Sequence, residues 1–197
     1  MRTGYRTAAL VAALLATLVQ ASPANAAGGP ATTAVVGGAS AANPSVGVAA
    51  PALRANADAK SVCLNAHVAG IGWQGWFCGV DGAAALVGTT GQNRRIEALS
   101  VSSTGTGGIC AQAHLGGVGW LSQVCVADGQ VATVGTTGQS RQMEALALGA
   151  PAATTCAEAH VAHTGWQGVR CAPPGLVTQV GTTGLSRRME ALTASVS

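Results

Sequence analysis

Aromatic and charged side chains are scarce in this sequence. Aromatic residues make up 3% and charged residues 9% of its 197 residues. The only lysine is Lys60, and ten basic residues face seven acids. Because phosphate binding requires clustered Lys and Arg, we expect no nucleic-acid partner. With so few aromatic residues, a core must be built mainly from Val, Leu, Ile, Ala and Met, and such a core is thin.

Long hydrophobic runs are also absent, apart from one near the N-terminus. Arg2 and Arg6 precede an uncharged apolar run over 8–19, and Ala24-Asn25-Ala26 forms an A-x-A cleavage site. The run is too short to span a bilayer comfortably. We therefore expect residues 1–26 to be a signal peptide, with secretion and no membrane insertion after cleavage. The alternative is a retained N-terminal anchor.

The segment 27–59 contains no aromatic residue and is rich in Ala, Gly, Pro, Ser and Thr. Such a segment buries too little apolar surface to offset its ordering entropy. We interpret it as a flexible leader, and a propeptide or an extra strand is the alternative.

The remaining residues, 60–197, consist of one unit repeated three times. After the first Cys of every unit, His follows at four residues, Trp at ten, a second Cys at fifteen, Gly-Thr-Thr-Gly at twenty-five and Glu at thirty-four. Chance does not produce such a register. We expect a single domain made of unit 1 (60–106), unit 2 (107–152) and unit 3 (153–197).

Six cysteines in an exported chain indicate oxidation. Copies of one unit should bond alike, and pairing within a unit closes a short loop. The expected disulfides are therefore Cys63–Cys78, Cys110–Cys125 and Cys156–Cys171. The alternatives are pairing between units and a metal site, for which the Cys and His residues are too dispersed. We expect no metal and no cofactor.

Composition and turn spacing predict an all-β fold. Gly and Thr are frequent, and the turn dipeptides Asp81-Gly82, Asp128-Gly129 and Pro174-Gly175 recur at one position of the unit. Each unit offers about four short strands, and one unit alone has too little core to be stable. We expect three four-stranded repeats that close around a pseudo-threefold axis, as in a β-trefoil-like or β-prism-like domain. An open solenoid is the alternative.

Several short motifs keep the same order in the units: His-Val or His-Leu, Gly-Trp-Gln, Gly-Thr-Thr-Gly-Gln-Ser and Arg-Met-Glu-Ala-Leu. Together they resemble the ChW repeat, the "clostridial hydrophobic, with conserved Trp" unit. The resemblance implies a secreted or surface-displayed bacterial protein that contacts carbohydrates or the cell surface. The cysteine pairs depart from the family pattern, and so does the absence of an attached catalytic domain, which speaks against an enzymatic role.

The tryptophans are candidate ligand contacts, because aromatic faces stack on sugar rings. Three of them repeat in every unit, and a residue at every symmetric position is more often core than ligand, so burial is the favoured reading. The repeated residues are Trp73, Trp120 and Trp166. Trp76 has no aromatic counterpart in the other units, which makes it the better candidate for an exposed contact.

Polar residues in and after the Gly-Thr-Thr-Gly motif are candidates for a sugar-binding groove, with plain solvent exposure as the alternative. They are Gln92, Gln139, Arg94, Arg141 and Arg187.

The repeated Glu residues fall in the last strand of each unit. Strand alternation places Glu97 on the same face as Leu99 and Val101, which should point inward. A carboxylate there needs hydrogen-bond donors or a cation. The nearest repeated candidates are the His, the Gly-Thr-Thr-Gly backbone and the Arg that lies three residues before each Glu, namely Arg94, Arg141 and Arg187. We expect each Glu to anchor the His or the Gly-Thr-Thr-Gly loop of its own unit, and we assign a structural role to Glu97, Glu144, Glu190, His67, His114 and His160.

No nucleophile elbow, HExxH motif or close carboxylate pair is present, so no catalytic residue is expected. We predict a secreted, non-catalytic binding module with up to three weak sites for a polysaccharide or cell-wall polymer, in which repetition provides avidity. The alternative is a protein-interaction or structural component of the bacterial cell surface.

Overall fold

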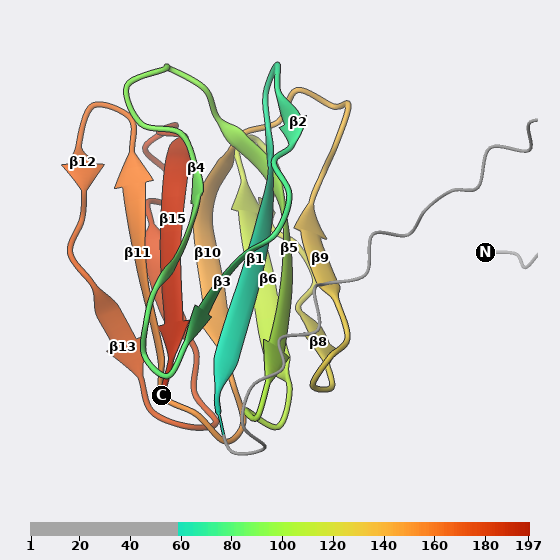
Figure 1. Ribbon diagram of the computed structural model, residues 1–197. Helices are drawn as coiled ribbons and strands as arrows, with labels where there is room; N and C mark the ends of the chain where they lie inside the picture. Colours follow the sequence, from blue (N-terminus) through green and yellow to red (C-terminus); the bar gives the residue numbers. More distant parts are fainter. Residues whose placement is uncertain (1–58) are drawn as a thin grey trace, which may run out of the picture. The chain divides into compact units, whose positions relative to one another are not determined.

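The computed structural model describes residues 59–197, which form fifteen β-strands and no helix (Figure 1). The predicted signal peptide and the predicted leader, except for its last residue Ala59, lie outside the described residues. The all-β prediction is confirmed.

Each unit contributes five strands in the same order. Unit 1 contains β1 (Ser61–Val68), β2 (Gly72–Trp73), β3 (Phe77–Val80), β4 (Ala85–Gly88) and β5 (Ile96–Thr104). Unit 2 contains β6 (Ile109–Leu115), β7 (Gly119–Trp120), β8 (Val124–Val126), β9 (Ala132–Gly135) and β10 (Met143–Gly149). Unit 3 contains β11 (Thr155–Val161), β12 (Gly165–Trp166), β13 (Arg170–Ala172), β14 (Thr178–Gly181) and β15 (Met189–Val196).

The units have five strands, not the expected four, because the strand predicted from Trp to the second Cys is interrupted. In unit 1 the break includes Gly75, which has a φ of 92°. Its N–H donates to the side chain of Asn65 at 3.0 Å and so leaves the backbone ladder. In unit 3, Gly168 donates in the same way to Glu158 at 2.8 Å.

The strands form three five-stranded antiparallel sheets, and every sheet combines two units. The sheet of unit 1 is completed by β9 of unit 2, that of unit 2 by β14 of unit 3, and that of unit 3 by β4 of unit 1. Figure 1 shows β4 running beside β15 although the two are far apart in the sequence. Each unit thus gives its fourth strand to the preceding unit, and unit 1 gives its fourth strand to unit 3.

This exchange closes on itself, which confirms the predicted pseudo-threefold arrangement. The open solenoid is excluded because unit 1 pairs with unit 3. Three separate sheets around one core correspond to the prism-like alternative, since a trefoil would require a shared barrel.

The core is aliphatic, as the composition predicts. Strands β6 and β11 both alternate between fully buried and half-buried residues along their length. Buried Val, Leu, Ile, Ala and Met residues from all three units form one cluster. Within the described chain, the largest fully buried side chains include Leu64, Ile96, Leu99, Met143 and Leu146, and none of them is aromatic.

A β-bulge interrupts the last long strand of each unit at its Glu. In unit 1, His67 pairs with Ala98 whereas Val68 pairs with Ile96, so Glu97 is the extra residue. The same shift occurs in the other two units. Ile96 and Leu99 consequently both face the core, three positions apart. The expectation that Glu97 shares the inward face of Leu99 is therefore wrong, because it assumed unbroken alternation.

The three predicted disulfides are present, one in each unit. Each joins residues directly opposite one another on neighbouring strands, with Cα atoms 4.0 Å apart. The described residues contain no free cysteine.

Candidate functional site

The repeated tryptophans lie on the surface, not in the core. Trp73, Trp120 and Trp166 are 43%, 38% and 42% exposed. Each ends a two-residue strand at the edge of its sheet. The expectation of burial is wrong, because the edge strand leaves its side chain partly uncovered.

Each of these tryptophans packs against the His opposite it in the strand pair. The ring centroids are 5.3 Å apart in every unit, and the planes meet at 76° to 78°. This edge-to-face arrangement is a favourable one for aromatic rings. The contact orients the indole while a large part of it stays accessible.

The bulged Glu lies next to the His. The His Nδ1 atom is 3.2 Å from Oε2 of Glu97 in unit 1, and the equivalent distances to Glu144 and Glu190 are both 3.4 Å. The predicted proximity of Glu and His is thus confirmed. No Nδ1 atom makes a hydrogen bond within the described residues, so the contact is close but not aligned for one.

The other carboxylate oxygen, Oε1, accepts from the residue two positions earlier. In unit 1, Arg95 donates to Glu97 through Nε at 3.0 Å and Nη2 at 2.8 Å. Arg188 makes the same pair of bonds to Glu190. Sequence reasoning had named the preceding arginine of each motif instead. The signal was available, because residues two apart lie on one face of a strand.

The main-chain carbonyl of each Glu holds the Gly-Thr-Thr-Gly loop of the next unit. Thr136 N–H donates to Glu97 at 3.0 Å, and Thr182 N–H donates to Glu144 at 2.8 Å. Thr89 of unit 1 closes the ring on Glu190 at 2.8 Å. The loop is therefore anchored by the Glu of a neighbouring unit and not, as expected, by that of its own.

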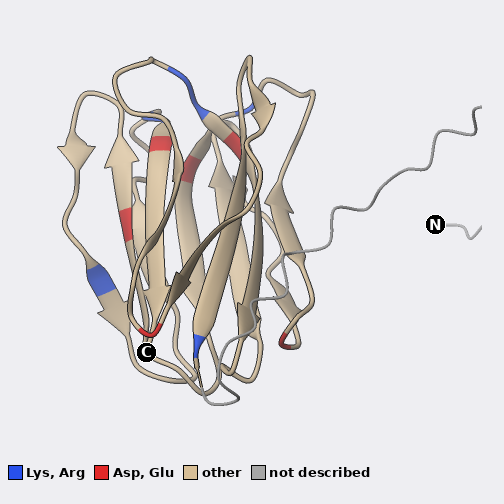
Figure 2. Cartoon of the chain, viewed as in Figure 1, with Lys and Arg blue, Asp and Glu red and all other residues tan. Residues whose placement is uncertain are grey.

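The charged residues that surround this arrangement gather at one end of the sheets. Figure 2 shows acidic positions near the starts of β5, β10 and β15, with basic residues in adjacent loops. Charged residues are otherwise sparse along the strands.

The predicted loop arginines reach the hairpin that carries Trp. Arg94 donates to the carbonyl of Ala69 at 3.0 Å, and Arg187 donates to Thr164 Oγ1 at 2.8 Å. Arg141 makes no such bond within the described part of the chain. Trp and Arg of one unit therefore lie at the same end of its sheet, whereas Gln92 and Gln139 are exposed in the loops.

A glutamine that sequence reasoning did not assign connects Trp to the Gly-Thr-Thr-Gly loop. Gln74 exchanges two hydrogen bonds with the main chain of Gly88, at 2.7 and 3.2 Å. Gln167 accepts from Gly181 in unit 3. The signal was the Gly-Trp-Gln motif, which only these two units share, since unit 2 has Leu121.

Trp76 is half-buried, and its Nε1 atom is enclosed without a hydrogen-bond partner in the described residues. It was expected to be the most exposed aromatic contact. The structure shows the opposite, because Trp73 on the edge strand is more accessible than Trp76.

Across residues 59–197, no three His, Cys, Asp or Glu side chains are grouped so as to hold a metal ion. The same residues include no helix long and apolar enough to cross a membrane.

Together, the fold and these contacts define a class of protein, an all-β domain of tandem repeats that each expose one Trp. The family model ChW, Clostridial hydrophobic W, matches residues 67–105 and 114–148, so units 1 and 2 are ChW repeats. Unit 3 has the same strands, disulfide and Trp–His–Glu contacts and is a third copy of that structure. ChW is a repeat family and not an enzyme family. No curated protein and no solved structure matches the chain.

Proposed function

We propose that this protein is a secreted, non-catalytic module that binds a carbohydrate or cell-wall polymer through its exposed tryptophans. One observation carries the proposal: three indoles at equivalent positions are 38–43% exposed, and each is oriented by a His.

A single exposed aromatic side chain requires no explanation. Here, however, the described residues contain Phe77 and four Trp, and four of these five aromatic residues are exposed: Phe77 and one Trp at the edge of each sheet. The core is built without them. A rigid indole surface of this kind suits the apolar face of a sugar ring, since it offers a large contact area at little conformational cost.

Polar groups beside each indole suit the hydroxyl groups of such a ligand. The Gly-Thr-Thr-Gly loop is tied to the Trp hairpin by Gln74 in unit 1 and by Gln167 in unit 3. The loops expose Thr90 and Thr137. A few placed donors and acceptors next to an apolar surface are typical of sites that orient a small ligand.

Three equivalent sites on one domain favour a repetitive ligand. A weak contact at each Trp gains avidity when one polymer chain engages more than one of them. The three disulfides support secretion, because disulfides persist outside the reducing cytoplasm.

The test is co-sedimentation of the oxidised chain 27–197 with peptidoglycan, cellulose, chitin and starch. Substituting Trp73, Trp120 and Trp166 with Ala, singly and together, should weaken binding about fivefold per site and abolish it in the triple variant. Thermal melting of each variant checks that the domain is still folded.

The matched control is Trp76→Ala, which removes a half-buried Trp from unit 1 and should leave binding unchanged. If the triple variant sediments as well as the unsubstituted chain, the exposed tryptophans are not the site. If the unsubstituted chain binds none of the polymers, the proposal fails, and a protein partner at the cell surface becomes the leading alternative.

A further inference from the structure

Unit 2 differs from its neighbours at the contact with the buried Glu. Where units 1 and 3 have Arg95 and Arg188, unit 2 has Gln142. The neutral amide donates one hydrogen bond to Glu144 Oε1 at 2.8 Å, in place of two from a guanidinium. Glu144 is the only repeated Glu without an Arg partner among the described residues.

A second difference in unit 2 lies at the same point. Gly116 stands where units 1 and 3 have an Ala. A Cβ atom at Gly116 would lie 2.9 Å from Glu144 Oε1 and 3.0 Å from Gln142 Cγ. Gly116 has no positive φ, so the backbone does not require a glycine here. Without a Cβ atom at this position, the Glu144 carboxylate and the Gln142 side chain lie closer to the main chain than an alanine would allow.

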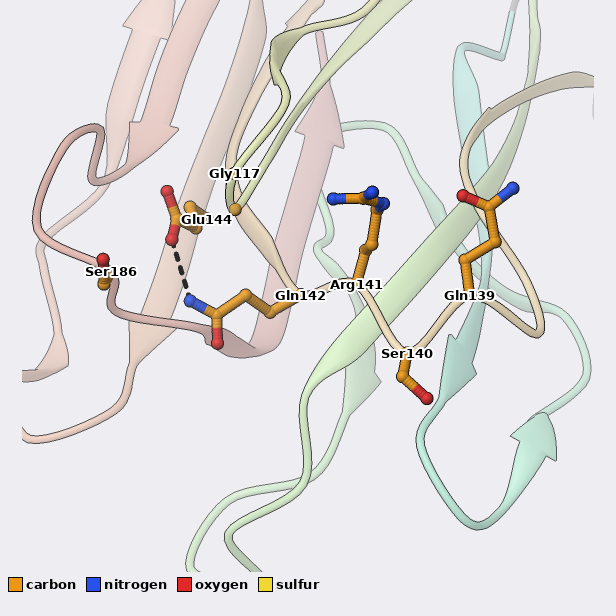
Figure 3. Close-up of a pocket in the computed structure, with 8 residues that line it drawn as sticks. Gly117, Gln139, Ser140, Arg141, Gln142, Glu144 and Ser186 are labelled. Atoms are coloured by element: carbon orange, nitrogen blue, oxygen red, sulfur yellow. Dashed lines mark hydrogen bonds between the residues drawn. The ribbon is translucent and has the colours of Figure 1, made fainter.

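The two differences coincide with a polar cavity of about 480 Å³ in unit 2. Figure 3 shows the Gln142 amide directed at Glu144, with Ser186 of the loop docked from unit 3 beside them. Asn93 is the equivalent of Ser186 in the loop docked on unit 3, and it contacts the Arg188 guanidinium there. The cavity of unit 2 therefore lies at the position that the Arg188 guanidinium fills in unit 3.

The charge of Glu144 is poorly compensated for its burial. Its side chain is only 4% exposed, and its Oε2 atom has His114 Nδ1 at 3.4 Å without an aligned hydrogen bond. A buried carboxylate without a cationic partner is costly. Arg141 also lines the cavity, but it is exposed and lies across Gly117 from Glu144 in Figure 3, so solvent screens its repulsion.

We propose that the unit 2 cavity binds a guanidinium or primary ammonium group of an external ligand, with the Glu144 carboxylate as its anchor. The incoming cation takes the place that Arg95 and Arg188 fill in the other units. Trp120 does not line this cavity, although His114 contacts both Trp120 and Glu144. The cation site does not depend on the proposed polymer binding.

The test is titration of the oxidised chain 27–197 with methylguanidinium at millimolar concentrations, followed by ¹H–¹⁵N NMR. We expect saturable shifts of the Gln142 side-chain amide and the Gly116 backbone amide. Methylurea has nearly the same shape and no charge, and it should give no saturable shift. Equal responses to both probes would overturn the proposal.

Gln142→Arg is the matched variant, because it fills the cavity with a side chain that units 1 and 3 already accommodate. It should weaken methylguanidinium binding at least about tenfold, since an internal guanidinium then satisfies Glu144. Glu144→Gln should also lose the response, and Trp120→Ala should keep it. Unchanged binding by folded Gln142→Arg would sink the assignment even if Glu144→Gln fails to fold.

Discussion

At the scale of single residues, Asp128 organises the loop that joins units 1 and 2. Its carboxylate accepts from Ser103, from the hydroxyl and N–H of Thr106, and from the N–H groups of Gly107 and Gly108. Burial raises the pKa of Asp128, but the bonds from Thr106, Gly107 and Gly108 together lower it below its ordinary value. The folded state thus favours the ionised carboxylate.

We predict that Asp128→Ala lowers the free energy of unfolding by about 1–3 kcal/mol at neutral pH, because several donors lose their acceptor. The control is Asp81→Asn, because Asp81 is the equivalent residue of unit 1 and, within the described residues, its carboxylate accepts only from Lys60 N–H. Asn tolerates the positive φ of 49° at this position, so the control adds no backbone strain. Urea denaturation of both variants measures the difference. Equal losses would contradict the assignment.

Asp128 also makes the free energy of unfolding depend on pH, with stability falling in acid. A lowered folded pKa contributes stability that is complete above the unfolded value of about 3.9 and is lost as pH falls through the folded pKa. The stability gap between Asp128→Ala and the unsubstituted chain should therefore narrow in acid below that value. A gap that persists there would show that Asp128 acts through packing and not through its charge.

At the scale of elements, the exchanged strand and the bulge depend on each other. The bulge leaves the Glu97 carbonyl free to accept from Thr136, which follows directly after β9. Gly135 ends that strand with a φ of 97°. A Cβ atom there would lie 2.5 Å from the Glu97 carbonyl oxygen, so only glycine permits the close approach.

We predict that Gly135→Ala destabilises the domain by about 2 kcal/mol more than Gly138→Ala. Gly138 also has a positive φ, of 72°, but a Cβ atom there would meet nothing within 4 Å. Both substitutions carry the strain of the left-handed conformation, and the difference isolates the contact between units. Chemical denaturation measures it, and equal effects would mean that the loop can move away at no cost.

At the scale of the whole molecule, we expect stability to require all three units. Each fourth strand is paired in a sheet that belongs mostly to another unit. The aliphatic core is thin, and the disulfides compensate for it. Each disulfide adds about 3 kcal/mol to the free energy of unfolding on the chain-entropy model. Those bridges are local and cannot replace the exchange between units.

We predict that deleting unit 3, residues 153–197, abolishes the cooperative unfolding transition of the monomer. The deletion leaves β10 without β14 and β4 without β15, so the ring of sheets cannot close. Circular dichroism during heating tests this. A monomeric two-unit chain that melts cooperatively would show that closure is dispensable.

The control for the deletion is a circular permutant that begins at unit 2 and joins residue 197 to residue 60 by a short linker. Both ends lie next to one turn, since Asp81 N–H donates to Lys60 and Gly82 N–H donates to Val196. The permutant keeps all three units and should fold.

The sequence by itself determined the features that depend on local spacing. The repeat of Cys, His, Trp and Glu established the three units, and the short separation of Cys110 and Cys125 predicted a disulfide within each unit. Turn dipeptides and composition predicted an all-β fold, because residues that are near in the chain set these properties. Closure was predicted from the number of repeats and from the need to cover sheet edges.

The tertiary structure decided the features that depend on contacts between units. The exposure of Trp73 follows from its place at a sheet edge, and the position of Glu97 follows from a bulge that a period of two does not reveal. The cavity at Glu144 depends on Gln142, Gly116 and a loop of unit 3 meeting at one point. These residues come together only because each unit gives a strand to its neighbour, and such long-range pairing leaves no local pattern in the chain.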